Sequence, residues 1–411
     1  MGQGGPALRN LGIRGIDHVD FVVHDLARSE KFYTQKMDFG VTARSTAKLE
    51  QETGERSAVY DAARVRVQCT MPLEKSSHAA KFLAAHPDGI RSLTFRVASV
   101  EHAWKTLEKR GANFLGEIEG KPGYRSFGIA SPLGDVEYRF LEKEGPWIAE
   151  DDAGNRTQGA VDPRLSPVVN AAHATGGNKH QFTHMDHVTS NTREMRSLTN
   201  WYRDVLGFEH FWDIRFHTRD SKPDMDGGSG LQSIVMWDPQ SNVKFATNEP
   251  LRPNYYASQI AKYVADNRGP GVQHIAFSTR AIMDVIPQMN ASGLKFLDTP
   301  DAYYQMLPKR LAERAVDNLK EDIAELKRRK ILVDGRDHRY LLQIFMQEAA
   351  VLYNEAAAGP FFYEVIQRKG DQGFGEGNFR ALFESIERHQ TGGDAAHPTG
   401  KRTVENPYLM D

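Results

Sequence analysis

The chain lacks the features that identify a secreted, membrane or nucleic-acid-binding protein. It contains one cysteine, Cys69, so it can form no intramolecular disulfide, which fits a reducing compartment. It has no apolar run of about 20 residues, the length needed to cross a membrane, and its first residues lack the apolar core of a signal peptide. Its net charge of -2 provides no general attraction for nucleic acid or an anionic membrane. We therefore expect a cytoplasmic protein whose partners are small molecules.

Two parts of the chain repeat the same short motifs. Ile16-Asp-His-Val19 recurs as Met185-Asp-His-Val188, and Gly89-Ile-Arg-Ser-Leu-Thr-Phe95 corresponds to Gly271-Val-Gln-His-Ile-Ala-Phe277. With 411 residues, the chain is long enough for two domains with cores of their own. We expect a first domain over residues 1–150, a linker over 151–180, a second domain over 181–390 and a polar tail over 391–411.

Three residues in apolar, strand-like segments are candidate metal ligands: His187, His274 and Glu364. Two imidazoles and one carboxylate form the open-sided triad that suits non-haem Fe(II). Strand alternation places His187 on the face of Met185 and Thr189. A lone histidine in a strand is more often a core residue than a ligand, but a carboxylate in an apolar strand is costly to bury without a cation.

The repeat offers an internal control for the metal hypothesis. His18 repeats the local sequence of His187, but Ser92 stands where the second half has His274. Only the second half can therefore complete the triad. We interpret His18 as structural.

Further polar and aromatic residues are expected near these strands. Ser233 can face a ligand, Ala246 shares a strand face with Asn248, and Gln343 shares one with Phe345. Each of these residues could also be ordinary core. Their joint presence beside the triad favours a pocket.

Two helical patterns are predicted in the second half. The glycine-rich segment 373–379 precedes an amphipathic pattern that starts at Phe379, with Asn378 as the expected N-cap. This helix is either a lid that closes over the pocket or a helix docked permanently on the core. Residues 309–330 also carry apolar residues at helical spacing.

Together these segments resemble the 4-hydroxyphenylpyruvate dioxygenase family, and the first half resembles the non-catalytic N-terminal domain of that family. The resemblance implies an α+β, vicinal-oxygen-chelate (glyoxalase/bleomycin-resistance-like) fold, with tandem βαβββ modules that form two half-open barrel domains. The matching motifs are Asn248-Glu-Pro250, Ser258-Gln-Ile260, Gly271-Val-Gln-His-Ile-Ala276, Ile331-Leu-Val-Asp334, Leu341-Leu-Gln-Ile-Phe345, Glu364-Val-Ile-Gln-Arg368 and Gly373-Phe-Gly-Glu-Gly-Asn-Phe379.

The resemblance also implies roles for single residues. His187, His274 and Glu364 would hold Fe(II). The substrate-binding residues would be Ser233, Ala246, Asn248, Gln259, Gln273, Phe362 and Phe374. The catalytic residues would be Gln343, Phe345, Asn378 and Phe379. Alternation places Gln273 on the strand face opposite His274, so its side chain reaches the pocket only if the strand is irregular there.

The implied reaction converts 4-hydroxyphenylpyruvate and O2 to homogentisate and CO2 in tyrosine catabolism, and we expect a homo-oligomer. Two alternatives remain open. Ala246 and Thr247 depart from the dioxygenase pattern, which keeps 4-hydroxymandelate synthase, a sister enzyme that uses the same substrate, as the second choice. Phe345 matches the dioxygenase. A non-catalytic ligand-binding protein on the same fold is the third reading, and it has no need for a complete triad.

Overall fold

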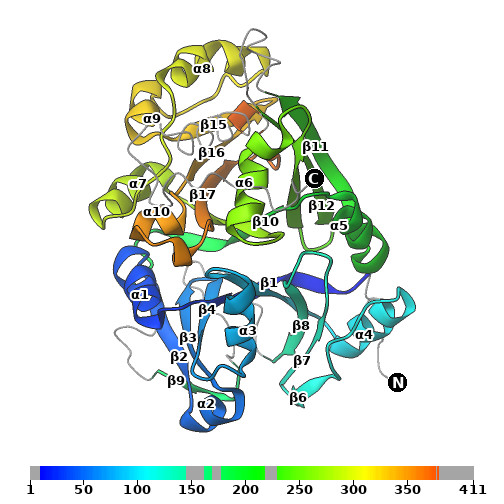
Figure 1. Ribbon diagram of the computed structural model, residues 1–411. Coiled ribbons are helices and arrows are strands. Elements are labelled where there is room, and N and C mark those ends of the chain that lie inside the picture. Colours follow the sequence, from blue (N-terminus) through cyan, green and yellow to red (C-terminus); the bar gives the residue numbers. More distant parts are fainter. Residues whose placement is uncertain (1–9, 145–161, 169–176, 218–228, 376, 379–411) are drawn as a thin grey trace, which may run out of the picture.

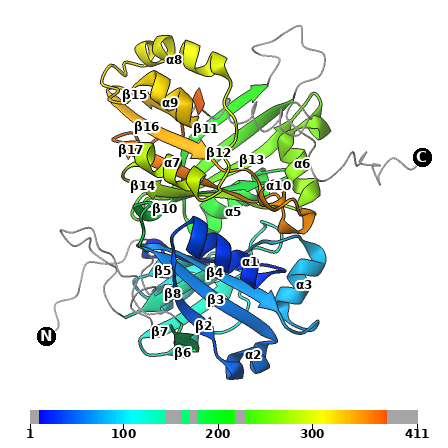
Figure 2. The ribbon, with the colours of Figure 1, turned by 90° about the vertical axis from the view of Figure 1, so that its left-hand side faces the viewer.

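The computed structural model describes residues 10–144, 162–168, 177–217, 229–375 and 377–378 (Figure 1). These residues form two sheets, one from each half of the chain, with helices around them (Figures 1 and 2). None of the described helices is both long enough and apolar enough to span a membrane.

The described residues of the first half form a nine-stranded sheet in the order β6-β7-β8-β5-β1-β4-β3-β2-β9. Its strands are β1 (Ile13–Val22), β2 (Gly40–Ser45), β3 (Glu55–Ala62), β4 (Val65–Pro72), β5 (Gly89–Val97), β6 (Glu119–Lys121), β7 (Tyr124–Ile129), β8 (Glu137–Lys143) and β9 (Leu165–Pro167). The helices of this half are α1 (Leu26–Lys31), α2 (Ala47–Thr53), α3 (His78–Ala85) and α4 (Val100–Lys109). The short strand β9 lies within the expected linker and pairs with β2.

The second half repeats this plan in a sheet of eight described strands, in the order β11-β12-β13-β10-β14-β17-β16-β15. Its strands are β10 (Phe182–Asn191), β11 (Glu209–His217), β12 (Gly230–Asp238), β13 (Val243–Leu251), β14 (Gly271–Thr279), β15 (Leu332–Arg336), β16 (Arg339–Phe345) and β17 (Phe362–Lys369). Its helices are α5 (Arg196–Trp201), α6 (Gln259–Asp266), α7 (Ile282–Ala291), α8 (Asp301–Glu313), α9 (Ile323–Arg329) and α10 (Ala349–Tyr353).

Strand pairing defines the repeated unit. In each half the first strands of two successive modules pair antiparallel, β1 with β5 and β10 with β14. Within each module the first and last strands pair in parallel, as in β10 with β13 and β14 with β17. Four βαβββ modules therefore build two half-barrels, and the expected fold is confirmed.

The helical pattern over residues 309–330 is interrupted, so the prediction of one helix there is wrong. Helix α8 ends at Glu313 and α9 begins at Ile323. Ala315 has a φ of 55°, a left-handed conformation that breaks a helix. The Asp322 side chain then accepts a hydrogen bond from the Glu325 backbone N–H and caps α9.

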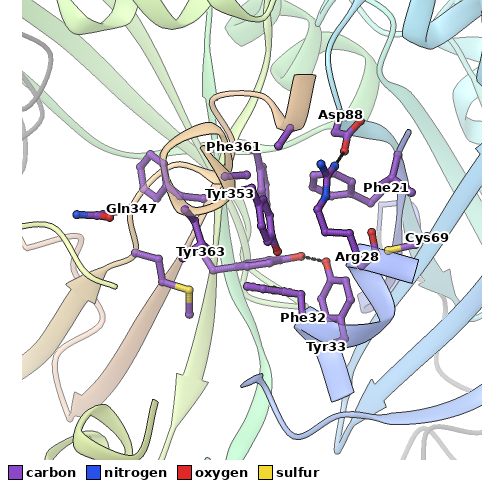
Figure 3. A pocket seen from close by; sticks show the side chains of 17 residues that line it. Phe21, Arg28, Phe32, Tyr33, Cys69, Asp88, Gln347, Tyr353, Phe361 and Tyr363 are labelled. Atoms are coloured by element: carbon purple, nitrogen blue, oxygen red, sulfur yellow. Dashed lines mark hydrogen bonds and ion pairs between the residues drawn. The ribbon is translucent and has the colours of Figure 1, made fainter. Parts of the chain in front are cut away.

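One hydrophobic cluster continues through both halves, from Leu11 to Val365. Two buried tyrosine pairs cross the boundary between the halves. The Tyr33 and Tyr363 hydroxyl oxygens are 2.6 Å apart, and those of Tyr138 and Tyr202 are 2.7 Å apart. Figure 3 shows Tyr33 and Tyr363 pointing toward each other beside an apolar cavity between the halves. The first half therefore packs directly against β17 of the second.

Candidate metal centre

Adjacent strands bring the three candidate ligands together. His187 lies on β10, His274 on β14 and Glu364 on β17. His187 is opposite Ala276, which is opposite Glu364, so these side chains share one face of the sheet. The Nε2 atoms of His187 and His274 lie 3.2 Å and 3.4 Å from Oε2 of Glu364. All three residues are buried, and one ligand atom from each lies within 4.8 Å of the others.

The hydrogen bonds of the two imidazoles orient their lone pairs. Nδ1 of His187 lies 2.9 Å from a carboxylate oxygen of Asp186, and Nδ1 of His274 lies 3.1 Å from the amide oxygen of Gln273. Both partners are acceptors, so in the neutral rings each Nδ1 carries the proton and each Nε2 presents a lone pair. Oε1 of Glu364 has no hydrogen-bond partner among the described residues. Three electron-pair donors thus converge on a buried point, an arrangement that a cation stabilises.

The electrostatics of the triad agree with this reading. Burial alone would raise the pKa of Glu364, but the two imidazoles lower it below its ordinary value. Burial alone would lower the pKa of His187, but the Glu364 and Asp186 carboxylates raise it. Burial lowers the pKa of His274. These shifts favour the ionised form of Glu364 and the neutral form of His274, as in metal ligands, whereas they favour the protonated form of His187, whose Nε2 proton a bound cation would replace.

A β-bulge determines on which face of the sheet the His187 side chain lies. Between Met185 and His187 the pairing of β10 with β14 shifts, so that Met185 is opposite Phe277 while His187 is opposite Ala276. Met185 belongs to the apolar core, and the expectation that it shares the face of His187 is wrong. The bulge inserts an extra residue and reverses the alternation at this point.

An ion pair fixes the residue behind His187. Arg368 donates to both carboxylate oxygens of Asp186, at distances of 2.7 Å and 2.6 Å. Although burial opposes it, the Arg368 guanidinium holds the pKa of Asp186 well below its ordinary value. The charged carboxylate then orients the His187 ring, as outer-shell carboxylates do in metal sites.

The first half has an equivalent ion pair behind His18 but lacks two of the three metal ligands. Asp17 contacts Nδ1 of His18 at 2.9 Å and pairs with Lys143 at 2.6 Å, as Asp186 does with His187 and Arg368. The strand registers place Arg139 at the position of Glu364, in addition to Ser92 at that of His274. A hydroxyl and a guanidinium replace two metal ligands. This explains physically why His18 has no metal site around it.

Aromatic rings enclose the triad. The Phe362 ring stacks on His274 at 5.0 Å, and Phe345 meets the same imidazole edge-on at 5.8 Å. The Phe374 ring lies 4.8 Å from that of His187. Ala246 is buried and packs with Phe374 and Val235. The structure thus brings Phe345, Phe362 and Phe374 to the triad, and Ala246 packs behind Phe374.

Comparisons with known proteins agree with this architecture. The family model for the glyoxalase/bleomycin resistance protein/dioxygenase superfamily matches residues 15–157 and 184–306. The 4-hydroxyphenylpyruvate dioxygenase of Dictyostelium discoideum is 32% identical over 394 residues, which cover 92% of this chain and 98% of that protein. The enzyme of the same name from Danio rerio is 33% identical over 385 residues, which cover 91% of this chain and 90% of that protein.

The chain belongs to the 4-hydroxyphenylpyruvate dioxygenase family. Among solved structures, a mutant of 4-hydroxymandelate synthase from Streptomyces coelicolor matches with a TM-score of 0.73 at 23% identity, covering 92% of this chain and 99% of that chain. The structural match supports the fold. The cofactor of the dioxygenase family is Fe(II), which the donor set of His187, His274 and Glu364 fits.

A second bulge decides where Gln273 points in this family member. The pairing of β10 with β14 shifts between Thr189 opposite His274 and Ser190 opposite Val272, which leaves Gln273 as the extra residue. Its side chain contacts His274, and its amide nitrogen lies 3.5 Å from the amide oxygen of Gln259. The bulge therefore lets the Gln273 side chain contact His274 and Gln259, which simple alternation would not allow.

Polar atoms without partners line the same face. Within the described chain, the Ser233 hydroxyl, Oδ1 of Asn248 and Oε1 of Gln343 are buried and make no hydrogen bond. Ser233 and Asn248 are directly opposite on β12 and β13. Buried polar atoms normally have partners, so these atoms are candidates to contact a bound molecule.

Side chains of α8 and β15 hold the turn formed by residues 373–375 and 377–378. The Tyr303 hydroxyl donates to Oδ1 of Asn378 at 2.5 Å, and the Gly377 backbone N–H donates to Asp334 at 2.9 Å. Gly377 and Asn378 are already helical, so Asn378 is not the N-cap that we expected. Phe379, the helix predicted from it and the tail lie outside the described residues. A Cβ on Gly375 would lie 2.6 Å from Oε1 of Gln343, so this turn packs closely on the pocket.

Removing the Tyr303 hydroxyl tests the importance of this turn. We expect Tyr303→Phe to lower turnover several-fold at unchanged iron content and to destabilise the fold by about 1–3 kcal/mol, because buried hydrogen-bonding groups lose their partner. The same change at Tyr304, whose hydroxyl makes no hydrogen bond to the described residues of the turn, is the control. Steady-state kinetics with iron analysis measures both. Equal activity of the two variants would contradict a role for Tyr303 in positioning the turn.

Sequence analysis missed several residues at the site. Asn191 shares the pocket face with His187 and with Thr189, which the alternation had indicated, and the same alternation could have indicated Asn191. The sequence around Arg368 and Tyr303 did not indicate that these two residues support the site. Arg368 belongs to a family motif, but its partner Asp186 is 182 positions away.

Proposed function

We propose that this protein is an Fe(II)-dependent dioxygenase that converts 4-hydroxyphenylpyruvate and O2 to homogentisate and CO2. The single observation that carries the proposal is the convergence of His187, His274 and Glu364 in a family member whose relatives bear that enzyme name. We also propose that residues 181–390 form the catalytic domain and residues 1–150 a non-catalytic one, since the first half replaces two ligands.

When bound, Fe(II) supplies open positions for the 2-oxo acid and the redox chemistry with O2. The chain itself holds and orients the substrate. Phe345 and Phe362 flank His274 and would keep the substrate ring close to the metal. The unpaired amide oxygen of Gln343 would accept a hydrogen bond on the metal side of the pocket. Phe374 beside His187 would exclude water.

The presence of Ala246 keeps 4-hydroxymandelate synthase as the second candidate. Its side chain is buried against Phe374, where a different residue would change how the ring is held. The aromatic wall of Phe345 and the names of the relatives support the dioxygenase as the first choice. The complete triad argues against a non-catalytic binding protein.

Identification of the product tests the proposal. We expect homogentisate as the main product from 4-hydroxyphenylpyruvate, Fe(II) and O2. We also expect Phe345→Ile to divert part of the flux to 4-hydroxymandelate, because a smaller wall lets the ring move relative to the reacting oxygen. Chromatography of the aromatic products is required, because both reactions release CO2. Hydroxymandelate as the chief wild-type product would replace the first choice by the second.

Two parts of the proposal concern the protein as a whole. We propose a cytoplasmic location, supported by the single cysteine and the small net charge. We propose a homo-oligomer on the basis of the family resemblance. Sedimentation of the purified protein tests the second statement, and a monomer would contradict it.

A further inference from the structure

An apolar cavity between the two halves of the chain has no part in the function described so far (Figure 3). Phe21 and Phe32 line it from the first half, and Leu352, Phe361 and Tyr363 line it from the second. Its volume is about 50 Å³, whereas one molecule of the size of water needs roughly 10–15 Å³. Ligand-binding pockets are frequent at such domain interfaces. The cavity therefore has room for a small molecule.

The polar groups around this cavity already have partners. The Arg28 guanidinium donates to the carboxylates of Asp88 and Glu355, and the hydroxyl groups of Tyr33 and Tyr363 bond to each other at 2.6 Å. No described residue that lines the cavity has a buried side-chain nitrogen or oxygen without a hydrogen-bond partner. A charged or strongly polar ligand would lose its hydration and find no unpaired buried group in return. The lining therefore suits a neutral, apolar occupant.

The pocket around the metal centre differs from the cavity in this respect. The Ser233 hydroxyl, Oε1 of Gln343 and Oε1 of Glu364 are buried there without a partner among the described residues. Such atoms call for a ligand with polar groups or for a cation. The two spaces therefore suit different molecules, a polar acid beside the metal and a neutral molecule between the halves.

Side chains at the boundary of the cavity also contact the metal centre. Phe362 lines the cavity, and its ring stacks on the imidazole of His274 at 5.0 Å. Met346, another residue of the lining, directly follows Phe345, whose ring meets the same imidazole at 5.8 Å. Because a methionine side chain adapts easily, movement of Met346 and Phe362 would connect the two spaces.

We propose that the cavity between the halves holds O2 and supplies it to the metal centre past Phe362. O2 is small, uncharged and apolar, and the transfer of an apolar molecule from water to an apolar environment is favourable. This inference rests on the proposed function, in which O2 is a substrate. It gives the first half a part in the reaction, because Phe21, Phe32 and Tyr33 form one wall of the cavity.

Xenon binding tests the cavity directly, because xenon is a neutral atom that enters dry, apolar cavities. We expect xenon in this cavity when crystals of the full-length protein are placed under xenon pressure and examined by X-ray diffraction. Ala358→Leu should abolish this binding, since Ala358 lines the cavity and leucine is larger. Ala349→Leu fills the same cavity from α10 and replaces the first variant if that protein folds poorly.

Steady-state kinetics at varied O2 concentration test the supply of O2. In Ala358→Leu, KM for O2 should rise several-fold, whereas kcat at saturating O2, KM for the 2-oxo acid and iron content should keep their wild-type values. Leu352→Ala enlarges the cavity and should bind more xenon without raising KM for O2. Ala103→Leu places the same larger side chain in the core of the first half, outside the cavity, and should change neither xenon binding nor KM for O2.

A wild-type cavity that excludes xenon, or that contains ordered water in its place, would overturn the inference. An unchanged KM for O2 in a folded variant that no longer binds xenon would overturn it as well. Neither result bears on the product formed. Failure of the proposed function would appear separately, as the absence of homogentisate when the wild-type enzyme receives 4-hydroxyphenylpyruvate and O2.

Discussion

Replacement of His187, His274 or Glu364 by alanine is expected to abolish both iron retention and turnover. Each change leaves only two ligands, and two ligands hold Fe(II) weakly and do not fix its open positions. The loss of turnover should exceed the roughly 10- to 100-fold effect that is typical for changes of outer-shell partners. Removing Glu364 also deletes the negative charge that offsets the metal charge in this buried site.

His18→Ala is the matched control for these variants. His18 contacts Asp17 as His187 contacts Asp186, and it has the equivalent position on its strand. Ser92 and Arg139 stand where the second half has the other two ligands. Its replacement should leave iron content and turnover at the wild-type level. Metal analysis of the four purified proteins, with circular dichroism to verify folding, measures the result. A triad variant with full iron content would remove that residue from the metal site.

The second large effect is expected from Arg368→Met. The change leaves the Asp186 carboxylate buried without its cation, at a cost of about 3–5 kcal/mol of folding stability. It also releases the Gly373 carbonyl, which accepts from Arg368 at 2.7 Å. Because Asp186 orients the ring of His187, iron affinity should fall by about 10- to 100-fold in addition. Thermal unfolding and an iron-binding titration measure the two effects.

Lys143→Met is the control that separates the loss of folding stability from the loss of iron affinity. It breaks the equivalent ion pair, with Asp17, in the half that has no metal ligands. It should lower the melting temperature but leave iron affinity unchanged. If both variants lose iron equally, the effect of Arg368 is general destabilisation and the positioning role assigned to Asp186 is wrong.

The sequence allowed the second sheet and the triad to be predicted because their signals are local. Short apolar strands mark the modules, and the repeat contrasts His187 with His18 and His274 with Ser92. The same alternation rule misplaced Met185 and left Gln273 in doubt. The error at Met185 and the open question at Gln273 have one cause, since a bulge depends on pairing with another strand and is invisible within a single segment.

Long-range contacts account for what the sequence could not indicate. The partners of Asn378 are Tyr303 and Arg310, which lie 75 and 68 positions away in the chain. Side chains of α8 therefore decide the conformation of the 373–378 turn, and local capping preferences do not. The break between α8 and α9 likewise depends on contacts outside the helical pattern, such as the Asp337 backbone N–H donating to the carbonyl of Arg314.

The tyrosine pairs between the halves make the metal-free half a structural part of the enzyme. Tyr363 directly precedes the ligand Glu364, and its hydroxyl is anchored by Tyr33 from the other half. A gene fragment that encodes only the second half would leave Tyr363 and the adjoining apolar face of β17 in water. Substitutions in the first half can therefore alter a metal site to which that half contributes no ligand, and duplication has here produced a specialised pair rather than two independent units.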